Sequence, residues 1–114
     1  MGNRVVVTGL GCMTPLGNDV SSSWEACING QSGIDRITHF DPELFRCQIA
    51  GEVKKFQLPE IIPIKEAKKM DLFIQYSIGA TQEALNDSGL EITEDIEEEV
   101  GVSMGVGIGG LGCI

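Results

Sequence analysis

The stretch that decides the fold class is Arg-Val-Val-Val-Thr-Gly-Leu-Gly-Cys-Met-Thr-Pro-Leu-Gly-Asn, residues 4–18. Residues 5–8 form a β-branched run, which is typical of a strand buried on both faces of a parallel sheet. The glycines and the proline that follow predict a tight loop, and a helix comes next. Because a strand that leads through a glycine-rich turn into a helix is typical of ligand-binding α/β folds, we predict an α/β protein.

The first half of the remaining chain predicts one helix and one short strand. Residues 20–29 form the helical pattern, with Asn18 or Asp19 as the residue that caps its start and Gly30 as the residue that ends it. Residues 49–53 predict a short strand.

The second half predicts two helices and another strand. Residues 64–70 predict a short basic helix, and the longest helix runs from the cap Asp71 to Ser88. Gly79 and Ala80 lie within this helix and are expected to let another backbone approach closely. A second valine-rich strand is expected over residues 100–106, followed by a glycine-rich segment. Because such a segment normally leads into a further helix, we expect this chain to be the opening part of a larger protein.

Composition narrows the classes of partner. The chain has 114 residues and a formal net charge of −9, which argues against nucleic acid as a partner. The length is sufficient for one small domain with a core. No run approaches the ~18 apolar residues that a membrane span needs, so no membrane is expected. No signal peptide precedes the first strand, and we therefore expect a cytoplasmic protein with reduced thiols.

Cysteine and histidine residues do not form a recognisable metal or catalytic motif. The cysteines are Cys12, Cys27, Cys47 and Cys113, and His39 is the single histidine. No CxxC pair or zinc-ligand spacing occurs, so no metal site is expected. We interpret the cysteines as small apolar packing residues and His39 as a structural or exposed loop residue.

The glycine-rich end also satisfies a dinucleotide-binding pattern. Gly105, Gly107 and Gly110 fit G-x-G-x-x-G, and so do Gly107, Gly109 and Gly112. A glycine-dense segment meets this pattern easily, and the helix and acidic residue that would support it do not follow within the chain. A nucleotide-binding α/β module therefore stays a minor alternative, and tight turns explain the same glycines.

Several motifs together resemble the N-terminal part of the β-ketoacyl-[acyl-carrier-protein] synthases, the condensing enzymes of fatty-acid synthesis. They follow the order of the family and cover nearly the whole chain. The motifs are VVVTGLGCMTPLGN (5–18), GQSGI (30–34), HFD (39–41), AGEVKKF (50–56), KEAKKMDLFIQYS (65–77), EALNDSGL (83–90) and GVGIGGLG (105–112).

The resemblance implies a thiolase-like fold with a layered α-β-α-β-α core in a homodimer. Residues 1–114 would be the opening part of the N-terminal half, in a domain that continues beyond Ile114. The implied activity is that of an acyltransferase without a cofactor. A cysteine thiolate takes an acyl group from acyl carrier protein, and malonyl-acyl-carrier-protein then loses carbon dioxide and attacks the acyl thioester. Backbone N–H groups stabilise the oxyanion, and two histidines serve the decarboxylation.

The catalytic residues of the family have no counterpart in this chain. None of its cysteines matches the position of the nucleophile, and His39 matches neither catalytic histidine. We therefore expect the 114 residues alone to be inactive.

Two other roles of the family carry over to residues that are present. Gly107 and Ile108 match the segment that lines the acyl pocket and limits chain length, although core packing is an alternative for Ile108. Lys65, Lys68 and Lys69 match a basic patch that faces the acidic carrier protein, and ordinary solvated lysines are the alternative.

Three alternative functions are each compatible with some of these sequence features. A non-elongating relative, such as a chain-length factor that pairs with an active synthase, has the same fold and differs at the nucleophile. A free-standing carrier-protein-binding fragment would use only the lysines, and a nucleotide-binding module would use only the glycines.

Overall fold

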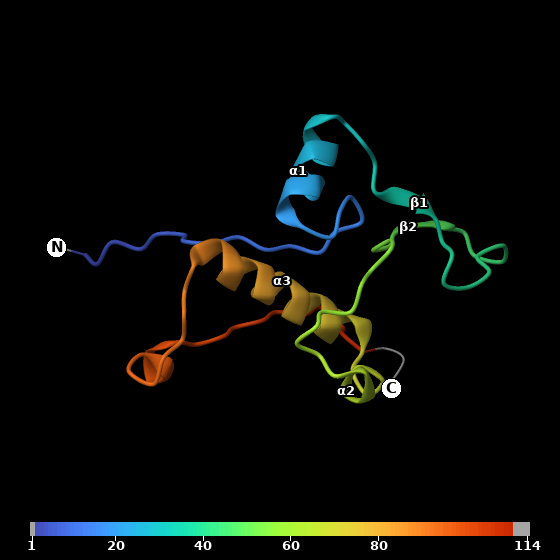
Figure 1. Ribbon diagram of the computed structural model, residues 1–114. Helices are drawn as coiled ribbons and strands as arrows, with labels where there is room; N and C mark the ends of the chain where they lie inside the picture. The colour runs from blue at the N-terminus through green and yellow to red at the C-terminus, as the bar shows by residue number, and fades with distance from the viewer. Residues whose placement is uncertain (1, 111–114) are drawn as a thin grey trace. The chain divides into compact units, whose positions relative to one another are not determined.

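The computed structural model of the protein describes residues 2–110, which divide into two compact units. One unit contains residues 12–57, and the other contains residues 2–11 together with 58–110. Both carry helices, and the sheet lies in the first of them, so the described part of the chain is a small mixed α/β structure. Figure 1 labels the helices and strands.

The first helix of the unit of residues 12–57 is α1 (Val20–Ile28), which starts at the predicted residue and ends one residue earlier than predicted. Asp19 is the residue that caps it, and its carboxylate accepts a hydrogen bond of 2.7 Å from the Ser22 amide. This backbone hydrogen bond holds the pKa of Asp19 below its ordinary value of 3.8. Gly30 follows the helix in a left-handed conformation with φ +66°, which favours glycine.

The same unit contains a two-stranded antiparallel sheet of β1 (Ile34–Arg36) and β2 (Ile49–Gly51). Ile34 lies opposite Gly51, and a side chain at Gly51 would meet the ring of Pro15 at 2.9 Å. The strand predicted over residues 49–53 is therefore present but shorter, and it pairs with a strand that the sequence did not predict.

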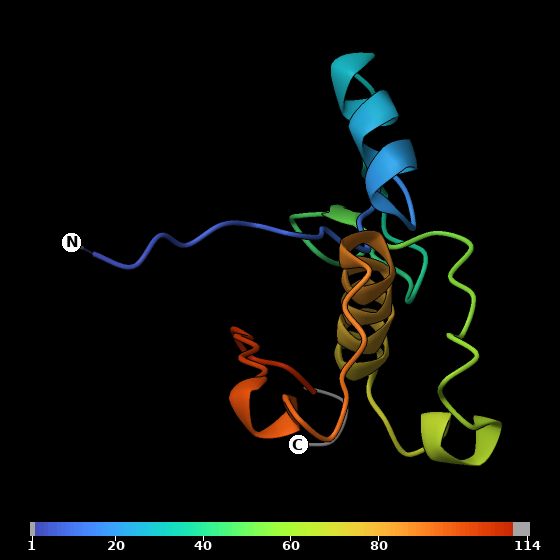
Figure 2. The same cartoon turned by 60° about the vertical axis from the view of Figure 1, so that its left-hand side comes forward.

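The other unit is built on α2 (Ile64–Ala67) and α3 (Leu72–Ser88). Figure 2 shows α2 at the N-terminal end of α3, joined to it by a short linker. The predicted long helix is confirmed, including its start after Asp71 and its end at Gly89, which has φ +65°.

The predicted basic helix over residues 64–70 is shorter than expected. α2 ends at Ala67, and the chain continues in tight turns in which the Lys69 amide donates to the Glu66 carbonyl at 2.9 Å and the Met70 amide donates to the Ala67 carbonyl at 3.1 Å. Bonds between residues three apart wind the chain more tightly than an α-helix and end it early.

Residues 9–11 lie directly on the backbone of α3. A methyl group on Gly11 would lie 2.7 Å from the Ala84 amide nitrogen and would collide with the Ala80 carbonyl oxygen, so only glycine fits there. The Leu10 amide donates to the Asp87 carboxylate at 2.9 Å, which ties the same segment to the helix end. The close backbone approach that was predicted for α3 is therefore present, and its contacts are with Ala80 and Ala84.

The strands predicted over residues 4–8 and 100–106 are not formed. Val5 is 90 % exposed and Val7 is 80 % exposed, and neither segment pairs with another among the described residues (Figure 1). A strand needs a neighbour to satisfy its amide and carbonyl groups, and the described chain supplies none to these segments. After the 3₁₀ helix η1 (Glu97–Glu99), the chain instead runs back along α3 (Figure 1).

Candidate functional site

The predicted docking lysines lie at α2 and in the turns that follow it. Lys65 is within the helix, Lys68 is its C-terminal cap, and Lys69 comes next. All three are exposed, and Lys69 forms an ion pair of 3.0 Å with Glu66. Over residues 2–110, neither Lys65 nor Lys68 lies within 4.0 Å of a carboxylate oxygen. Their charges are therefore available to an acidic partner, whereas that of Lys69 is partly compensated.

Gly107 and Ile108, the predicted acyl-pocket residues, lie near residue 110, in the same unit as the lysines. Ile108 is 72 % exposed, and a side chain at Gly107 would meet no atom within 4 Å. Among the described residues, neither Gly107 nor the Ile108 side chain is enclosed by other parts of the chain. Its role in an acyl pocket stays a prediction.

The two residues after Ile108 contact the first turn of α3. Gly109 has φ +71°, and a methyl group there would touch the Phe73 ring at 3.4 Å. A methyl group on Gly110 would collide with the Asp71 carboxylate and lie 2.8 Å from its Cγ. Asp71 follows the docking lysines by two residues, so the structure brings the end of the lysine segment and the glycine segment to one end of α3.

An apolar hollow of about 420 Å³ runs along α3 and was not predicted. The hydroxyls of Ser77 and Thr81 lie in its wall, but each donates to a carbonyl of its own helix at 2.8 Å. The hollow therefore offers an apolar surface that can hold or pack against an apolar group, and it has no acid or base. The remaining lining residues are Ile61, Phe73, Ile74, Ile78, Gln82, Leu85, Val102 and Met104.

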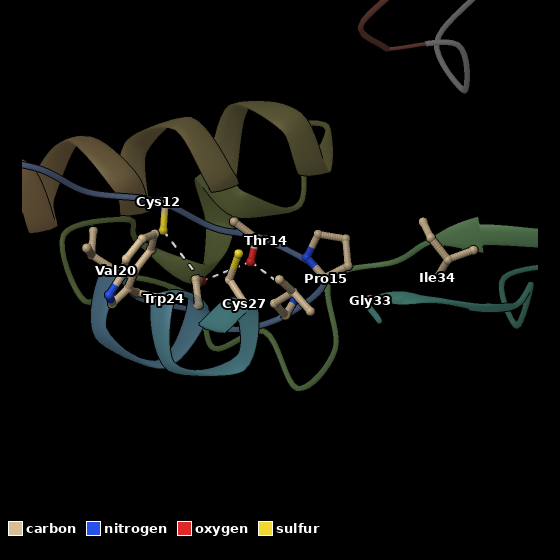
Figure 3. Close-up of a pocket in the computed structure, with 10 residues that line it drawn as sticks. Cys12, Thr14, Pro15, Val20, Trp24, Cys27, Gly33 and Ile34 are labelled. Atoms are coloured by element: carbon tan, nitrogen blue, oxygen red, sulfur yellow. Dashed lines mark hydrogen bonds between the residues drawn. The ribbon is translucent and has the colours of Figure 1, made fainter. Parts of the chain in front are cut away.

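A second hollow, of about 480 Å³, belongs to the unit of residues 12–57 (Figure 3). Its polar groups are already bonded to one another. Thr14 Oγ1 lies 2.9 Å from Ser23 Oγ, and Ser23 Oγ donates to the Gly17 carbonyl at 3.1 Å. Cys12 Sγ donates to Ser23 Oγ at 3.5 Å, and Cys27 also lines the hollow. The network closes the turn before α1, which is a structural role.

The structure places His39 and the cysteines apart from any catalytic arrangement. His39 is exposed in the loop between β1 and β2 and does not line the hollow of Cys12 and Cys27. A thiol needs a base within hydrogen-bond distance to act as a nucleophile. The interpretation of the cysteines as packing residues is wrong for Cys27 and Cys47, which are exposed at the helix surface and in a loop. Gly112 and Cys113 lie outside the described residues.

The described residues contain neither a metal centre nor a membrane-spanning helix. Residues 2–110 contain no group of three or more His, Cys, Asp or Glu side chains arranged to hold a metal ion. None of the helices described there is long and apolar enough to cross a bilayer.

Comparison with known proteins identifies the family. The family model described as "Beta-ketoacyl synthase, N-terminal domain" matches residues 2–112. The chain belongs to the β-ketoacyl synthase family. It is 57 % identical over 111 residues to the 3-oxoacyl-[acyl-carrier-protein] synthase 2 of Vibrio harveyi, which is 97 % of this chain and 27 % of that protein. The protein of the same name from Staphylococcus aureus strain COL is 46 % identical over 108 residues, 95 % of this chain and 26 % of that protein.

Solved structures agree with this assignment. The ishigamide ketosynthase/chain length factor matches with a TM-score of 0.64 and 33 % identity, over 79 % of this chain and 22 % of that chain. A β-ketoacyl synthase from Burkholderia phymatum STM815 matches with a TM-score of 0.65 and 28 % identity, over 83 % of this chain and 24 % of that chain. The resemblance to the synthases and the thiolase-like fold class are thereby confirmed, and the layered core stays a prediction. The family assignment replaces the nucleotide-binding alternative.

Proposed function

We propose that this chain forms the N-terminal part of an acyltransferase that elongates fatty acids by decarboxylative condensation on acyl carrier protein. The observation that carries the proposal is the 57 % identity to a 3-oxoacyl-[acyl-carrier-protein] synthase 2 across 97 % of the chain. The chain spans about a quarter of the length of such relatives. The activity therefore belongs to a protein that also contains the rest of the domain.

The proposed reaction has two stages. A cysteine thiolate of the complete domain attacks the acyl thioester of acyl carrier protein, forms a new thioester and releases the carrier's thiol. Malonyl-acyl-carrier-protein then loses carbon dioxide, and the electron pair of the broken C–C bond forms a bond to the acyl carbonyl carbon. The enzyme thiolate leaves as the β-ketoacyl product forms. In this proposal, the nucleophile and the base for these steps both come from the rest of the domain, and none of the described cysteines serves as the nucleophile.

In this proposal, the contribution of Lys65, Lys68 and Lys69 is to bind the carrier protein. They form a local positive cluster in a chain with net charge −9, and all three are exposed. Opposite charges on a partner would be attracted to this cluster and away from the acidic remainder of the chain. Lys65 and Lys68 would make the first contacts, because Lys69 must first exchange Glu66 for the partner.

The proposed contribution of Gly107 and Ile108 is to line the acyl chain. Ile108 presents a branched apolar side chain with 72 % of its surface uncovered, and contact with an alkyl chain would remove that surface from water. Glycine at 107 leaves space beside it.

A chimeric enzyme tests the proposed function. Residues 1–114 would replace the equivalent quarter of the Vibrio harveyi synthase, and the chimera would be assayed with acyl- and malonyl-acyl-carrier-protein. We expect β-ketoacyl product from the chimera and none from the 114-residue chain alone. Lys65→Glu with Lys69→Glu should raise KM for the carrier protein about tenfold or more without an equal loss of kcat. Arg46→Glu is the matched control, because Arg46 is exposed and lies outside the cluster.

A non-elongating partner of an active synthase is the second candidate. The similarity to a ketosynthase/chain length factor at 33 % identity supports it. The chimera carries the nucleophile of the Vibrio harveyi synthase, so its activity does not separate the two candidates. A coding frame in which the segment after Ile114 lacks the catalytic cysteine of the family would favour the non-elongating partner over the elongating enzyme. The homodimer implied by the family resemblance and the expected cytoplasmic location are part of the same proposal.

A further inference from the structure

Asp71 does not use its side chain in the way its position predicts. It is the residue that precedes α3, yet its carboxylate makes no capping hydrogen bond to the helix. The carboxylate instead lies against Gly110, where it occupies the space that the Cβ atom of any other residue would need. Gly110 and Asp71 are therefore matched, because a glycine is required at 110 for the carboxylate to lie where it does.

The segment that carries the lysines is tied to the same turn of α3. Gln75, in the first turn, donates from Nε2 to the Ala67 carbonyl at 3.0 Å and to the Met70 carbonyl at 3.0 Å. These carbonyls flank Lys68 and Lys69. A displacement of the lysine backbone therefore reaches Asp71 through the linker and Gln75.

The glycine segment rests on this turn at two points. Gly110 contacts the Asp71 carboxylate, and the left-handed Gly109 lies against the Phe73 ring. Ile108 comes immediately before them and has no comparable support, since it is 72 % exposed. The position of its backbone is thus set by Gly109 and Gly110.

We propose that Asp71 is a positioning residue that couples carrier-protein docking at Lys65, Lys68 and Lys69 to the Gly107–Gly110 segment and so to Ile108. The inference rests on the proposed function, because it assumes that a carrier protein binds these lysines. A partner that draws Lys68 and Lys69 outward displaces the linker, and Asp71 transmits the displacement to Gly110 by direct contact. The consequence is that Ile108 occupies different positions with and without a docked carrier.

Nuclear magnetic resonance of the chimera with the Vibrio harveyi synthase, isotope-labelled at lysine and glycine, tests this coupling, with holo acyl carrier protein as the titrant. In the chimera that carries the unmodified chain, we expect the amide resonances of Lys65, Lys68 and Lys69 to shift together with those of Gly109 and Gly110. In Asp71→Ala, the lysine resonances should still shift, and the response of the two glycines should be lost. Helix α3 should persist in this variant, because Asp71 makes no capping bond to it.

Two further variants separate contact from charge. Gly110→Ala places a methyl group where the carboxylate lies, so it should abolish the glycine response while Asp71 is retained. Glu66→Gln removes a carboxylate beside the lysines that is bonded to Lys69, and it should leave the glycine response intact. A glycine response that is absent from the unmodified chain, or that survives Asp71→Ala, overturns the coupling. Absence of any lysine response overturns carrier docking itself, which is a separate failure.

Discussion

Helix α3 and the valine-rich segments 4–8 and 100–106 belong to one unit but satisfy their backbones differently. The helix bonds its own amides and carbonyls over 17 residues and ends at the left-handed Gly89. Its hydroxyls at Ser77 and Thr81 also donate within the helix. The valine-rich segments have no strand partner among residues 2–110, and most of the surface of Val5, Val7 and Val102 is exposed.

The difference shows what each element needs from the rest of a protein. A helix closes its hydrogen bonds within one segment, so its backbone pairing does not depend on a distant part of the chain. A strand of a parallel sheet needs neighbouring strands, and crossover connections place those neighbours far away in the chain. Residues 9–11 lie between the two cases, because they are held by a helix rather than by a strand.

The largest effect is expected from a substitution that detaches residues 9–11 from α3. Gly11→Ala places a methyl group against the Ala80 carbonyl and the Ala84 amide, which are backbone atoms and cannot rotate away. We expect a loss of about 3 kcal/mol in the free energy of unfolding, as for other overpacked sites. Hydrogen exchange of the Leu10 amide measures the local effect, because this amide is bonded to Asp87.

The control for Gly11→Ala is Gly101→Ala. A methyl group at Gly101 meets no atom within 4 Å, and its φ angle does not require glycine. Equal losses of stability in the two variants would show that the contact on α3 is not responsible.

A smaller effect is expected at the start of α1. Asp19→Ala removes the acceptor of the Ser22 amide and should cost about 1 kcal/mol, whereas Asp19→Asn keeps an acceptor at the same place and should cost less. Far-ultraviolet circular dichroism during urea unfolding measures both. Equal losses in the two variants would show that the negative charge, rather than the hydrogen bond, stabilises α1.

A pH effect is expected in the loop between β1 and β2. The Glu52 carboxylate accepts hydrogen bonds from the Thr38 amide at 3.0 Å and the His39 amide at 3.2 Å. The Thr38 backbone bond is the main cause that holds the pKa of Glu52 below its ordinary value of 4.5. A carboxylate with a depressed pKa stabilises the folded state fully above its unfolded pKa. The contribution of Glu52 is therefore present above pH 4.5 and is lost as the pH falls below it.

Amide chemical shifts measured against pH test the role of Glu52. The Thr38 and His39 amides should titrate together in the acidic range, and Glu52→Gln should remove that titration. Glu43→Gln, in the same loop, is the control and should leave it unchanged. A persistent titration in Glu52→Gln would assign the effect to another group.

Helices α1 and α3 were predictable because their signals are local. Asp19 and Gly30 delimit α1, and Asp71 and Gly89 delimit α3, in each case within a few residues of the helix that they end. Strand β1 was missed because Ile34–Arg36 has no strand pattern of its own. It forms by pairing with Ile49–Gly51, which lies beyond a long loop.

The sequence predicted which residues belong to the candidate site, but it did not predict which of them contact one another. The family resemblance pointed to Lys65, Lys68, Lys69, Gly107 and Ile108, which the sequence separates by about 40 positions. The contact of Asp71 with Gly110 depends on the chain running back along α3, and no local pattern encodes that. The available signal was ambiguous, because Asp71 also fits a helix cap and Gly110 also fits a dinucleotide loop.

The smallest effect is expected from substitutions in the valine-rich segment at the start of the chain. Val6 is 60 % exposed, so Val6→Thr should change the unfolding free energy of the 114-residue chain by less than about 0.5 kcal/mol. In the chimera with the Vibrio harveyi synthase, the same substitution should lower the thermal midpoint clearly, because there a sheet would bury the side chain and leave the threonine hydroxyl in an apolar layer. Thermal unfolding of both proteins measures the contrast. A large effect in the short chain would mean that residues 4–8 already find a partner there, and no effect in the chimera would mean that they form no buried strand in the complete fold.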